Sequence, residues 1–336
     1  MSKIVNHNES FKKYFVKYKN KVLLNNICKV QYTMNIGIFG AGSFGEKHLN
    51  IINKIKEFKI VGFYDPNREK CLSVEKKHGI KAFQSELDLI HNCDAIDIVS
   101  STETHCKLIK LGIKYKKHIF VEKPICCNKY EVAELLIHNK TVKQVIQVGH
   151  IERYNPAMEF NLIDTNKITE IHAKRTGIIN KRNKNNSIVL DLMIHDIDLI
   201  TKLIDSPIKS IKTKKYQSNS FESVEVNIIF KNSKKAQLIS ERGVNIKNYR
   251  KMSILLNDKR IKIDFLNKTH EHWRKGIKEK VFKLDNNVNP LQNEFIEFYN
   301  NIINKQLPTV GLQAACHAVS IALQIEELSK IKELKK

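Results

Sequence analysis

The chain has 336 residues, of which 42% are hydrophobic, and its formal net charge is +23. It is long enough for two domains with separate cores, and its composition is ordinary for a folded globular protein. Lys, Asn or Asp interrupts every apolar stretch before the ~18 residues that a membrane span needs. An integral membrane protein is therefore excluded, and no membrane partner is expected.

The positive charge comes mainly from lysines spread along the chain, alongside many Asn and Ile residues. Because these three residues share A/T-rich codons, genome composition accounts for the excess, and no nucleic-acid partner is expected. The positive electrostatic field of the protein still suits attraction of an anionic substrate into a cleft. The seven cysteines are odd in number and lack C-x-x-C spacing, which predicts a reducing, cytoplasmic location.

Residues 1–33 are rich in lysine and have no clean amphipathic period. They lack the apolar core and cleavage site of a secretory signal, so we expect a basic N-terminal extension. Met34 directly precedes the first strong strand. It is therefore a candidate natural start, and a short helical or disordered arm is the other interpretation.

Residues 34–150 alternate short apolar strands with helices. This alternation predicts a dinucleotide-binding Rossmann domain, a doubly wound parallel sheet with helices on both faces. The predicted strands are NIGIF, KIVGFY, IKAF, AIDIVS, HIFVEKP and VIQVGH.

In residues 151–336 the regular alternation of strands and helices stops. The pattern there predicts an α+β domain for substrate binding and oligomerisation. After Asn155-Pro156 we expect a polar helix, a strand near residues 170–176 and a helix at Ser187–Ile204. The segments VEVNIIF, AQLISERG, KMSILL and RIKIDF follow with short turns, which predicts a mainly antiparallel, open-faced sheet. Helices at residues 289–304 and 311–330 are expected to close the structure.

A glycine-rich turn follows the first strand. Gly40, Gly42 and Gly45 form a G-x-G-x-x-G pattern that opens a helix, which is the required context for a dinucleotide site. Gly40 permits the tight turn, Gly42 lets a pyrophosphate approach, and Gly45 allows close helix packing. Ser43 and Phe44 stand in the same turn, so their backbone is expected to contribute to cofactor binding.

Asp65 lies twenty residues beyond Gly45, at the end of KIVGFY. A carboxylate there accepts hydrogen bonds from the adenosine ribose and repels a 2′-phosphate, so NAD is predicted. Asn67 and Arg68 just beyond it keep NADP open as the alternative cofactor.

Glu122, Lys123 and Pro124 follow the strand HIFV, so they are expected at the crevice where ligands bind in a doubly wound sheet. A solvated loop lysine is the alternative for Lys123. The loop after AIDIVS borders the same crevice, and its hydroxyls are suited either to contact the cofactor or to cap a helix. The cofactor contacts predicted here are Ser101, Thr102, His105, Glu122 and Lys123.

The helix Ser187–Ile204 has a narrow polar stripe of Asp191, His195, Asp198 and Lys202 at helical spacing. A stripe that faces water is the ordinary alternative, but the rest of this helix is apolar, which favours a cleft. Asp191 is expected to orient the His195 ring and raise its pKa for acid/base work. No third ligand stands at a recognised spacing, so no metal is expected.

Arg153, Tyr154 and Asn155 join the two predicted domains. The planar donor fork of an arginine suits phosphate or carboxylate recognition, so these residues are candidate substrate contacts together with Lys123, Asp191 and His195. A hinge salt bridge is the alternative role for Arg153.

These motifs occur together and in order, and the chain from Met34 onward resembles the Gfo/Idh/MocA oxidoreductases. The segments GHIERYNPA and DLMIHDID resemble its branch containing UDP-N-acetylglucosamine 3-dehydrogenases. The resemblance implies a catalytic Lys123, an acid/base pair of Asp191 and His195, and a second-domain sheet that floors the substrate pocket. It also implies a homo-oligomer, dimer or tetramer.

The implied reaction moves a hydride from a sugar carbon, C3 of a nucleotide sugar, to nicotinamide. Lys123 would stabilise the developing alkoxide, while His195, its ring held by Asp191, would relay the proton. An inositol-type polyol dehydrogenase, a hydrolase using NAD catalytically, and a cofactor-binding redox sensor are the alternatives. A sensor needs no acid/base group, so the sequence favours an enzyme.

Overall fold

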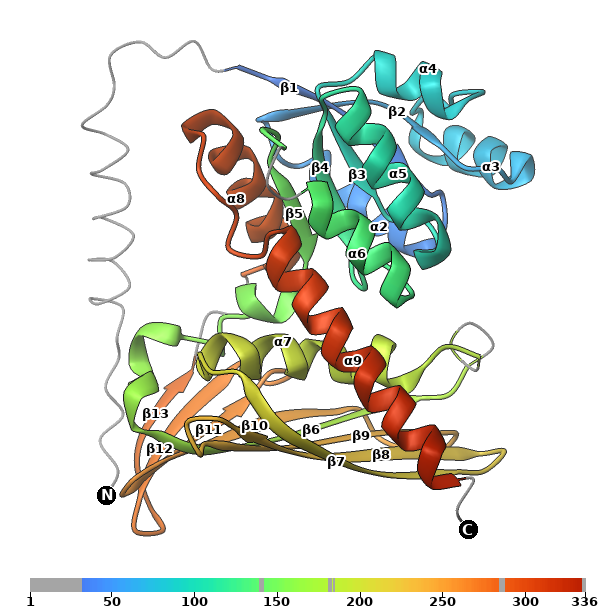
Figure 1. The fold of residues 1–336 in the computed structure, drawn as a ribbon. Coiled ribbons are helices and arrows are strands. Elements are labelled where there is room, and N and C mark those ends of the chain that lie inside the picture. The colour runs from blue at the N-terminus through green and yellow to red at the C-terminus, as the bar shows by residue number, and fades with distance from the viewer. Residues whose placement is uncertain (1–31, 139–141, 181–182, 184, 284–287, 334–336) are drawn as a thin grey trace, which may run out of the picture.

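A computed structural model describes residues 32–138, 142–180, 183, 185–283 and 288–333. Two sheets dominate it, one of five and one of eight strands. Figure 1 shows the smaller sheet with its helices above the larger one. The predicted N-terminal extension falls almost entirely outside the described residues. None of the described helices is long and apolar enough to cross a membrane.

The five-stranded sheet is parallel throughout, with the order β2-β1-β3-β4-β5. Its strands are β1 (Met34–Phe39), β2 (Phe58–Tyr64), β3 (Ala95–Ile98), β4 (His118–Glu122) and β5 (Ile146–Gly149). The intervening helices are α2 (Ser43–Ile52), α3 (Arg68–His78), α4 (Glu86–His91), α5 (Thr102–Lys114) and α6 (Lys129–His138). The predicted doubly wound parallel sheet is confirmed.

One predicted strand, IKAF, is wrong. It makes only an isolated bridge between Phe63 and Ala82. The neighbouring helices explain why the chain turns here instead of extending: Gly79 ends α3 in the left-handed conformation, and the Ser85 hydroxyl accepts a hydrogen bond from the Asp88 N–H to start α4.

The eight-stranded sheet is antiparallel except where β6 pairs with β9, in the order β13-β12-β11-β10-β6-β9-β8-β7. Its strands are β6 (Ile168–Ile178), β7 (Ile208–Gln217), β8 (Phe221–Phe230), β9 (Lys235–Gly243), β10 (Tyr249–Leu256), β11 (Lys259–Asp264), β12 (Thr269–Arg274) and β13 (Ile277–Lys283). The predicted mainly antiparallel sheet is confirmed, although β7, β12 and β13 were not predicted from the sequence.

The polar helix predicted after Asn155-Pro156 is also wrong. Short 3-10 turns stand there: η1 (Ile151–Tyr154), η2 (Phe160–Leu162) and η3 (Thr165–Lys167). Asn155 accepts a hydrogen bond from the Ala157 N–H, and Asp164 accepts one from the Asn166 N–H. Such local bonds from a side chain to the backbone compete with a regular helix.

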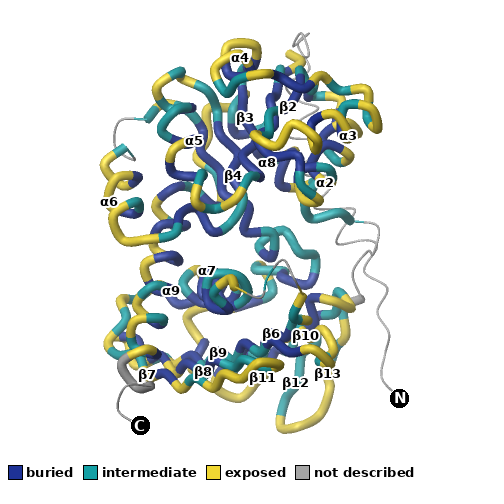
Figure 2. Tube along the Cα trace, turned by 90° about the vertical axis from the view of Figure 1, so that its right-hand side faces the viewer, coloured by how far each residue is buried: buried dark blue, intermediate teal, exposed yellow. Residues whose placement is uncertain are grey.

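One face of the eight-stranded sheet is covered and the other is open. The π-helix η4 (Val189–Met193), α7 (Ile194–Leu203) and α9 (Leu312–Glu333) lie over the face that points to the five-stranded sheet (Figure 1). Figure 2 shows mostly buried residues along this inner side, while exposed and intermediate residues line the outer side. No described helix covers the outer face.

The closing helix α8 (Pro290–Asn304) packs on the five-stranded sheet although it follows the second sheet in sequence. Asn289 caps it by accepting hydrogen bonds from two backbone N–H groups, with Pro290 in the first turn. Phe295 stacks on Phe120 of β4, with ring centroids 4.4 Å apart, and Phe298 stacks on Phe58 of β2. Together with α2, α8 therefore covers one face of the first sheet.

Candidate active site

The glycine turn lies between β1 and α2, and each glycine meets a different requirement. Gly40 has φ +115°, and a Cβ there would lie 2.8 Å from the Val99 carbonyl oxygen. A Cβ at Gly45 would collide with the Gly40 carbonyl oxygen. Gly42 precedes α2 without a side-chain cap, and a Cβ there would meet nothing within 4 Å. The turn thus leaves space before a helix N-terminus, where a pyrophosphate fits.

Asp65 is fixed beside this turn. Its Oδ2 accepts a hydrogen bond from the Ala41 N–H and its Oδ1 accepts one from the Asn67 N–H, both at 2.8 Å. A carboxylate oxygen has more than one lone pair, so each still has room for a ribose hydroxyl. The open space at Gly42 and the oriented Asp65 carboxylate fit a dinucleotide.

The loop that begins α5 only partly matches its prediction. Ser101 is exposed at the helix N-cap, and its hydroxyl makes no capping bond, so it stays a candidate cofactor contact with Thr102. His105 is 1% exposed, and its two ring nitrogens lie 2.9 Å from the Pro124 carbonyl oxygen and 3.2 Å from that of Ser100. His105 therefore ties two loops together, which corrects its predicted contact with the cofactor.

A buried imidazole joins three elements beneath the crevice. His48 of α2 lies 2.9 Å from Oδ2 of Asp97 on β3 and 3.3 Å from Oε1 of Glu122 on β4. Burial alone would lower the pKa of His48, but the two carboxylates outweigh it and raise the pKa to about 10. His48 is therefore an imidazolium between two carboxylates. Glu122 also accepts the backbone N–H of Lys123.

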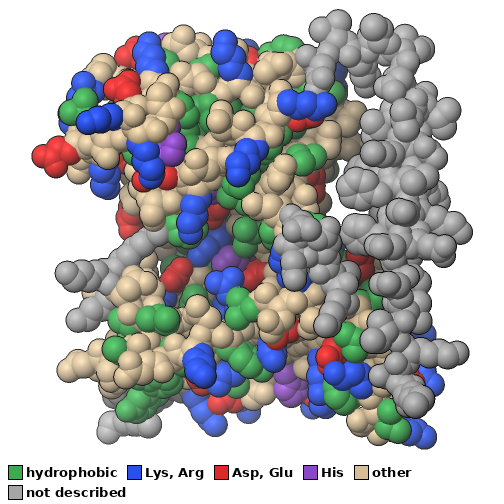
Figure 3. Space-filling view, turned by 180° about the vertical axis from the view of Figure 1, so that it is seen from behind, with side chains coloured by type: hydrophobic (Ala, Val, Ile, Leu, Met, Phe, Trp, Pro, Cys, Tyr) green, Lys and Arg blue, Asp and Glu red, His purple; other side chains and the backbone are tan. Residues whose placement is uncertain are grey.

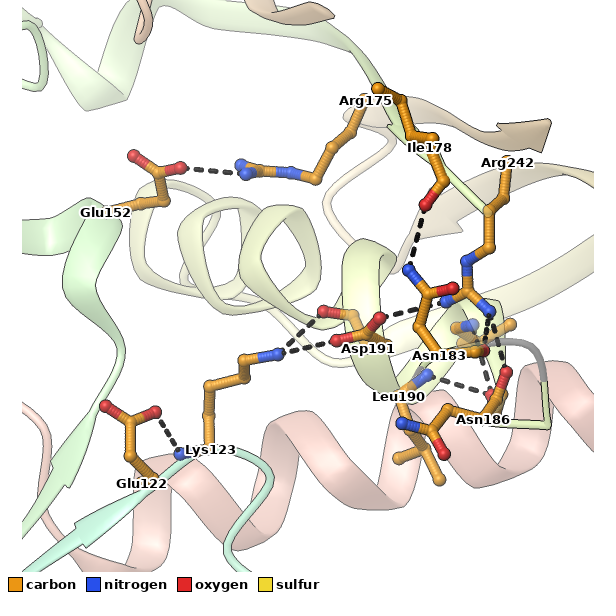
Figure 4. Close-up of polar contacts among 12 residues, drawn as sticks. Glu122, Lys123, Glu152, Arg175, Ile178, Asn183, Asn186, Leu190, Asp191 and Arg242 are labelled. Atoms are coloured by element: carbon orange, nitrogen blue, oxygen red, sulfur yellow. Dashed lines mark hydrogen bonds and ion pairs between the residues drawn. The ribbon is translucent and has the colours of Figure 1, made fainter. Parts of the chain in front are cut away.

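Lys123 leaves the end of β4 and reaches the other half of the molecule (Figure 4). Its Nζ donates to the backbone oxygen of Asp191 at 2.8 Å and to Oδ1 of the same residue at 3.1 Å. Oδ2 of Asp191 accepts from Arg242 of β9 at 3.0 Å. The Lys123 side chain is 16% exposed, so it is held in place and is not a solvated loop lysine.

The helix with the polar stripe is not the regular helix that the sequence predicted. Ser187 caps its start through the Val189 and Leu190 N–H groups, and η4 leads into α7. The wider π turn breaks the assumed helical spacing between Asp191 and His195.

His195 also differs from the prediction. No described hydrogen bond joins its ring to Asp191, whose carboxylate contacts Lys123 and Arg242 instead. Burial, followed by the charges of Lys123 and Arg175, holds the pKa of His195 well below its ordinary value. The predicted rise in pKa is wrong. His195 is a neutral imidazole at pH 7, which is the form that accepts a proton.

The junction residues are occupied by contacts within the chain. Arg153 donates to both oxygens of Asp198, at 2.6 and 2.7 Å, and its side chain is only 4% exposed. Asn155 donates to Glu152 and to the Phe265 carbonyl oxygen. Tyr154 accepts a hydrogen bond from Gln147, and burial raises the pKa of its phenol. For Arg153 the structure favours the alternative role, a hinge salt bridge. The substrate contacts of Tyr154 and Asn155 stay predictions.

Sequence reasoning missed the arginines that the eight-stranded sheet supplies. Arg175 of β6 donates to both oxygens of Asp196 and to Glu152, and Arg250 of β10 lies beside it. Each arginine stands two residues from a buried apolar residue of its own strand, Ala173 for Arg175 and Met252 for Arg250, and this shared phase was the available signal. The carboxylates that these arginines bind could be identified only once β6, β10 and α7 were placed in the fold.

Figure 3 shows, from behind, a hollow between the two halves of the molecule in which basic, acidic and histidine side chains are visible. Lys123 enters this region from the first sheet and Asp191 from η4, while Arg242 supports Asp191 from the second sheet (Figure 4). The arrangement offers one hydrogen-bond donor for an oxyanion and one neutral imidazole. It can therefore assist removal of a proton from a hydroxyl.

A dinucleotide turn beside a lysine and a histidine defines the class of a nicotinamide-dependent oxidoreductase. Residues 34–150 match the model of the oxidoreductase family with NAD-binding Rossmann fold, the Gfo/Idh/MocA family. These residues are therefore an NAD-binding Rossmann domain of this family, and the family resemblance seen in the sequence is confirmed for this part of the chain.

Two relatives and one solved structure are similar to this chain. It is 26% identical over 246 residues to a UDP-N-acetylglucosamine 3-dehydrogenase of Acidithiobacillus ferrooxidans, covering 72% of this chain and 78% of the relative. It is 25% identical to a myo-inositol 2-dehydrogenase of Thermotoga maritima, covering 53% and 57%. A crystal structure of the Acidithiobacillus enzyme has a TM-score of 0.82 at 24% identity, covering 88% and 97%.

Proposed function

We propose that the protein oxidises a secondary hydroxyl of a nucleotide sugar, of the UDP-N-acetylglucosamine type and at C3. The single observation that carries a hydroxyl oxidation is the fixed Lys123, held at Asp191 beside a neutral His195. The choice of nucleotide sugar is supported by the relative from Acidithiobacillus ferrooxidans, which matches over most of both chains.

The residues take the following roles. When bound, NAD accepts a hydride from the carbon that carries the hydroxyl group. Lys123 donates a hydrogen bond from Nζ to the hydroxyl oxygen and stabilises its developing negative charge. The neutral His195 accepts the hydroxyl proton, so the carbon becomes a ketone and the imidazole becomes an imidazolium. Asp191 positions Lys123 instead of His195, and Arg242 holds Asp191.

The outer face of the eight-stranded sheet is proposed as the contact of a homo-oligomer. It carries the strand residues that no described helix covers (Figure 2). Sedimentation of the purified protein gives the number of subunits.

The test is a trapping assay with purified protein, NAD and UDP-N-acetylglucosamine. Hydroxylamine captures the keto product, because the equilibrium of such oxidations can lie toward the alcohol. We expect NADH and a trapped product with the mass of the oxime of the 3-keto sugar nucleotide. Protein that forms NADH with inositol or glucose, and no trapped product with any UDP-sugar, would show that the nucleotide-sugar proposal is wrong.

An inositol-type dehydrogenase is the second candidate. The specific observation in its favour is the 25% identity to the Thermotoga maritima enzyme, although that match covers 53% of the chain. The same assay, run with myo-inositol in parallel, separates the two candidates.

A further inference from the structure

Arg250 lies on the covered face of the eight-stranded sheet. In the antiparallel pairing of β10 with β6, Arg250 stands opposite Arg175. Side chains directly opposite each other in an antiparallel pair point to the same face. Arg175 reaches Asp196 of α7 and Glu152 of η1, so this face is the one toward the cleft.

The two arginines differ in how well they are paired. Arg175 is 1% exposed and makes hydrogen bonds of 2.8 to 3.1 Å with Glu152 and Asp196. The side chain of Arg250 is 42% exposed, and its one contact with a described carboxylate is a longer bond of 3.4 Å to Glu152. The same Glu152 oxygen is already bound by Arg175, and the other oxygen accepts from Asn155.

Each cation around the cleft meets a carboxylate, but not equally well. The cations are Lys123, Arg175, Arg242 and Arg250, and the carboxylates within contact of them are Asp191, Glu152, Asp196 and Glu222. Arg250 is the most weakly paired of the four cations, because the one carboxylate oxygen that it contacts is shared with Arg175. Like charges at directly opposite positions destabilise a sheet, so Arg250 beside Arg175 is unfavourable without a further anion.

Arg250 also lies within electrostatic reach of the catalytic centre. Its charge is one of those that hold the pKa of His195 down, after burial and the charges of Lys123, Arg175 and His150. Arg153, by contrast, gives its guanidinium to both oxygens of Asp198. Of these two arginines, only Arg250 has a side chain open to a ligand, since it is 42% exposed and Arg153 is 4% exposed.

We infer that Arg250 recognises the anionic part of the substrate, binding the diphosphate of a nucleotide sugar. This contact rests on the proposed function, since a neutral polyol has no such group. The planar guanidinium presents parallel N–H donors that match two phosphate oxygens, which the single ammonium of a lysine cannot do.

The experiment measures KM for UDP-N-acetylglucosamine and the inhibition constant of UDP in Arg250→Gln. Both are expected to rise about 10- to 100-fold, as for loss of a charge-assisted hydrogen bond. The value of kcat at saturation and the affinity for NAD should change little, because the contact is made equally before and during the reaction.

Lys251→Gln is the matched control. Lys251 is the next residue of β10, has a similar exposed fraction and pairs with Asp264, but it lies on the opposite face of the sheet. Lys251→Gln should leave KM and the inhibition constant of UDP unchanged. If both constants rise equally in Lys251→Gln and Arg250→Gln, the cause is a general loss of positive electrostatic potential, and a direct contact of Arg250 is overturned.

Arg250→Lys covers the case in which Arg250→Gln fails to fold, which loss of NAD affinity would reveal. This substitution keeps the positive charge but loses the planar pair of N–H donors. We therefore expect KM for UDP-N-acetylglucosamine and the inhibition constant of UDP to rise less than in Arg250→Gln. If the wild type oxidises a UDP-sugar and both Arg250 variants keep its KM, the contact alone is wrong. If the wild type oxidises only polyols, both the contact and the proposed function are wrong.

Discussion

The cofactor side and the substrate side of the cleft are both built on buried ion pairs, but the cation at the centre of each cluster differs. Beneath the crevice of the first sheet, the His48 imidazolium stands between Asp97 and Glu122, which leaves one negative charge. On the second sheet the guanidinium groups of Arg175, Arg242 and Arg250 contact the carboxylates of Glu152, Asp196, Asp191 and Glu222. Lys123 links the two sides through Asp191.

The difference follows from the ligands that each side meets. A negative cluster behind the strand ends suits a site where the ring of the oxidised cofactor carries a positive charge. On the second sheet the weakly paired Arg250, whose side chain is 42% exposed, suits an anionic substrate. Each side is thus matched to a different charge, and the next four changes test that match from the largest expected effect to the smallest.

Gly42→Val should remove NAD binding and, with it, all activity. A Cβ at Gly42 meets nothing within 4 Å, so the fold should tolerate the larger side chain while the space for the pyrophosphate is lost. Calorimetric titration with NAD measures the binding, and Gly42→Ala provides an intermediate. A folded Gly42→Val protein that binds NAD with the affinity of the wild type would contradict the assignment of the turn.

Lys123→Ala should lower kcat by roughly 10²- to 10⁴-fold, the range for loss of a positioned acid/base or oxyanion group. NAD affinity should change much less, because Lys123 is bound to Asp191 and not to the glycine turn. Steady-state kinetics measures both. The control is Lys129→Ala, an exposed lysine of α6 paired with Glu327, which should keep full activity.

His48→Asn should cost about 3–5 kcal/mol of unfolding free energy, the usual effect of breaking a buried ion pair. The pKa of His48 is about 10 in the folded protein and about 6.5 when unfolded. Because the folded value is the higher one, the stabilisation is full below pH 6.5 and is lost as the pH rises toward 10. Denaturant unfolding at pH 6 and pH 9.5 tests this.

The outcome that contradicts the imidazolium is a difference between wild type and His48→Asn that stays constant over this pH range. His91→Asn serves as the control, since His91 is exposed at the end of α4. Its effect on the unfolding free energy should be small at both pH values.

Asp65→Ser should weaken NAD binding by about tenfold or more, since a charged acceptor of ribose hydroxyls is lost. NADP should gain relative to NAD, because the carboxylate that repels a 2′-phosphate is gone. The ratio of the two dissociation constants is the measurement. Wild-type protein that already prefers NADP would show that the role given to Asp65 is wrong.

The predictions that the structure corrected involve partners far apart along the chain, whereas the others involve residues close together. Gly40, Gly42, Gly45 and Asp65 could be singled out because a turn and the next strand are local features with a fixed chemical meaning. Arg153 was misread because its partner Asp198 lies 45 residues away. From sequence alone, an arginine that binds a ligand and one that binds an aspartate are indistinguishable.

The same reason explains His195. Its place on a largely apolar helix was visible in the sequence, and the helical spacing made Asp191 its expected partner. The π turn and the approach of Lys123, 68 residues away from Asp191, redirected that carboxylate. Burial and the nearby cations then lowered the pKa of His195, where the local pattern had predicted a rise.

The sequence by itself determined the parallel sheet, the glycine turn, the place of Asp65 after the second strand and the position of Lys123 at a strand end. These depend on strand and helix periodicity and on backbone conformations that act over a few residues. Only the tertiary structure decided which carboxylate meets which cation, and so which arginine keeps donors for a ligand. The strength of a Coulomb interaction depends on separation and burial in space, and neither can be read from positions along the chain.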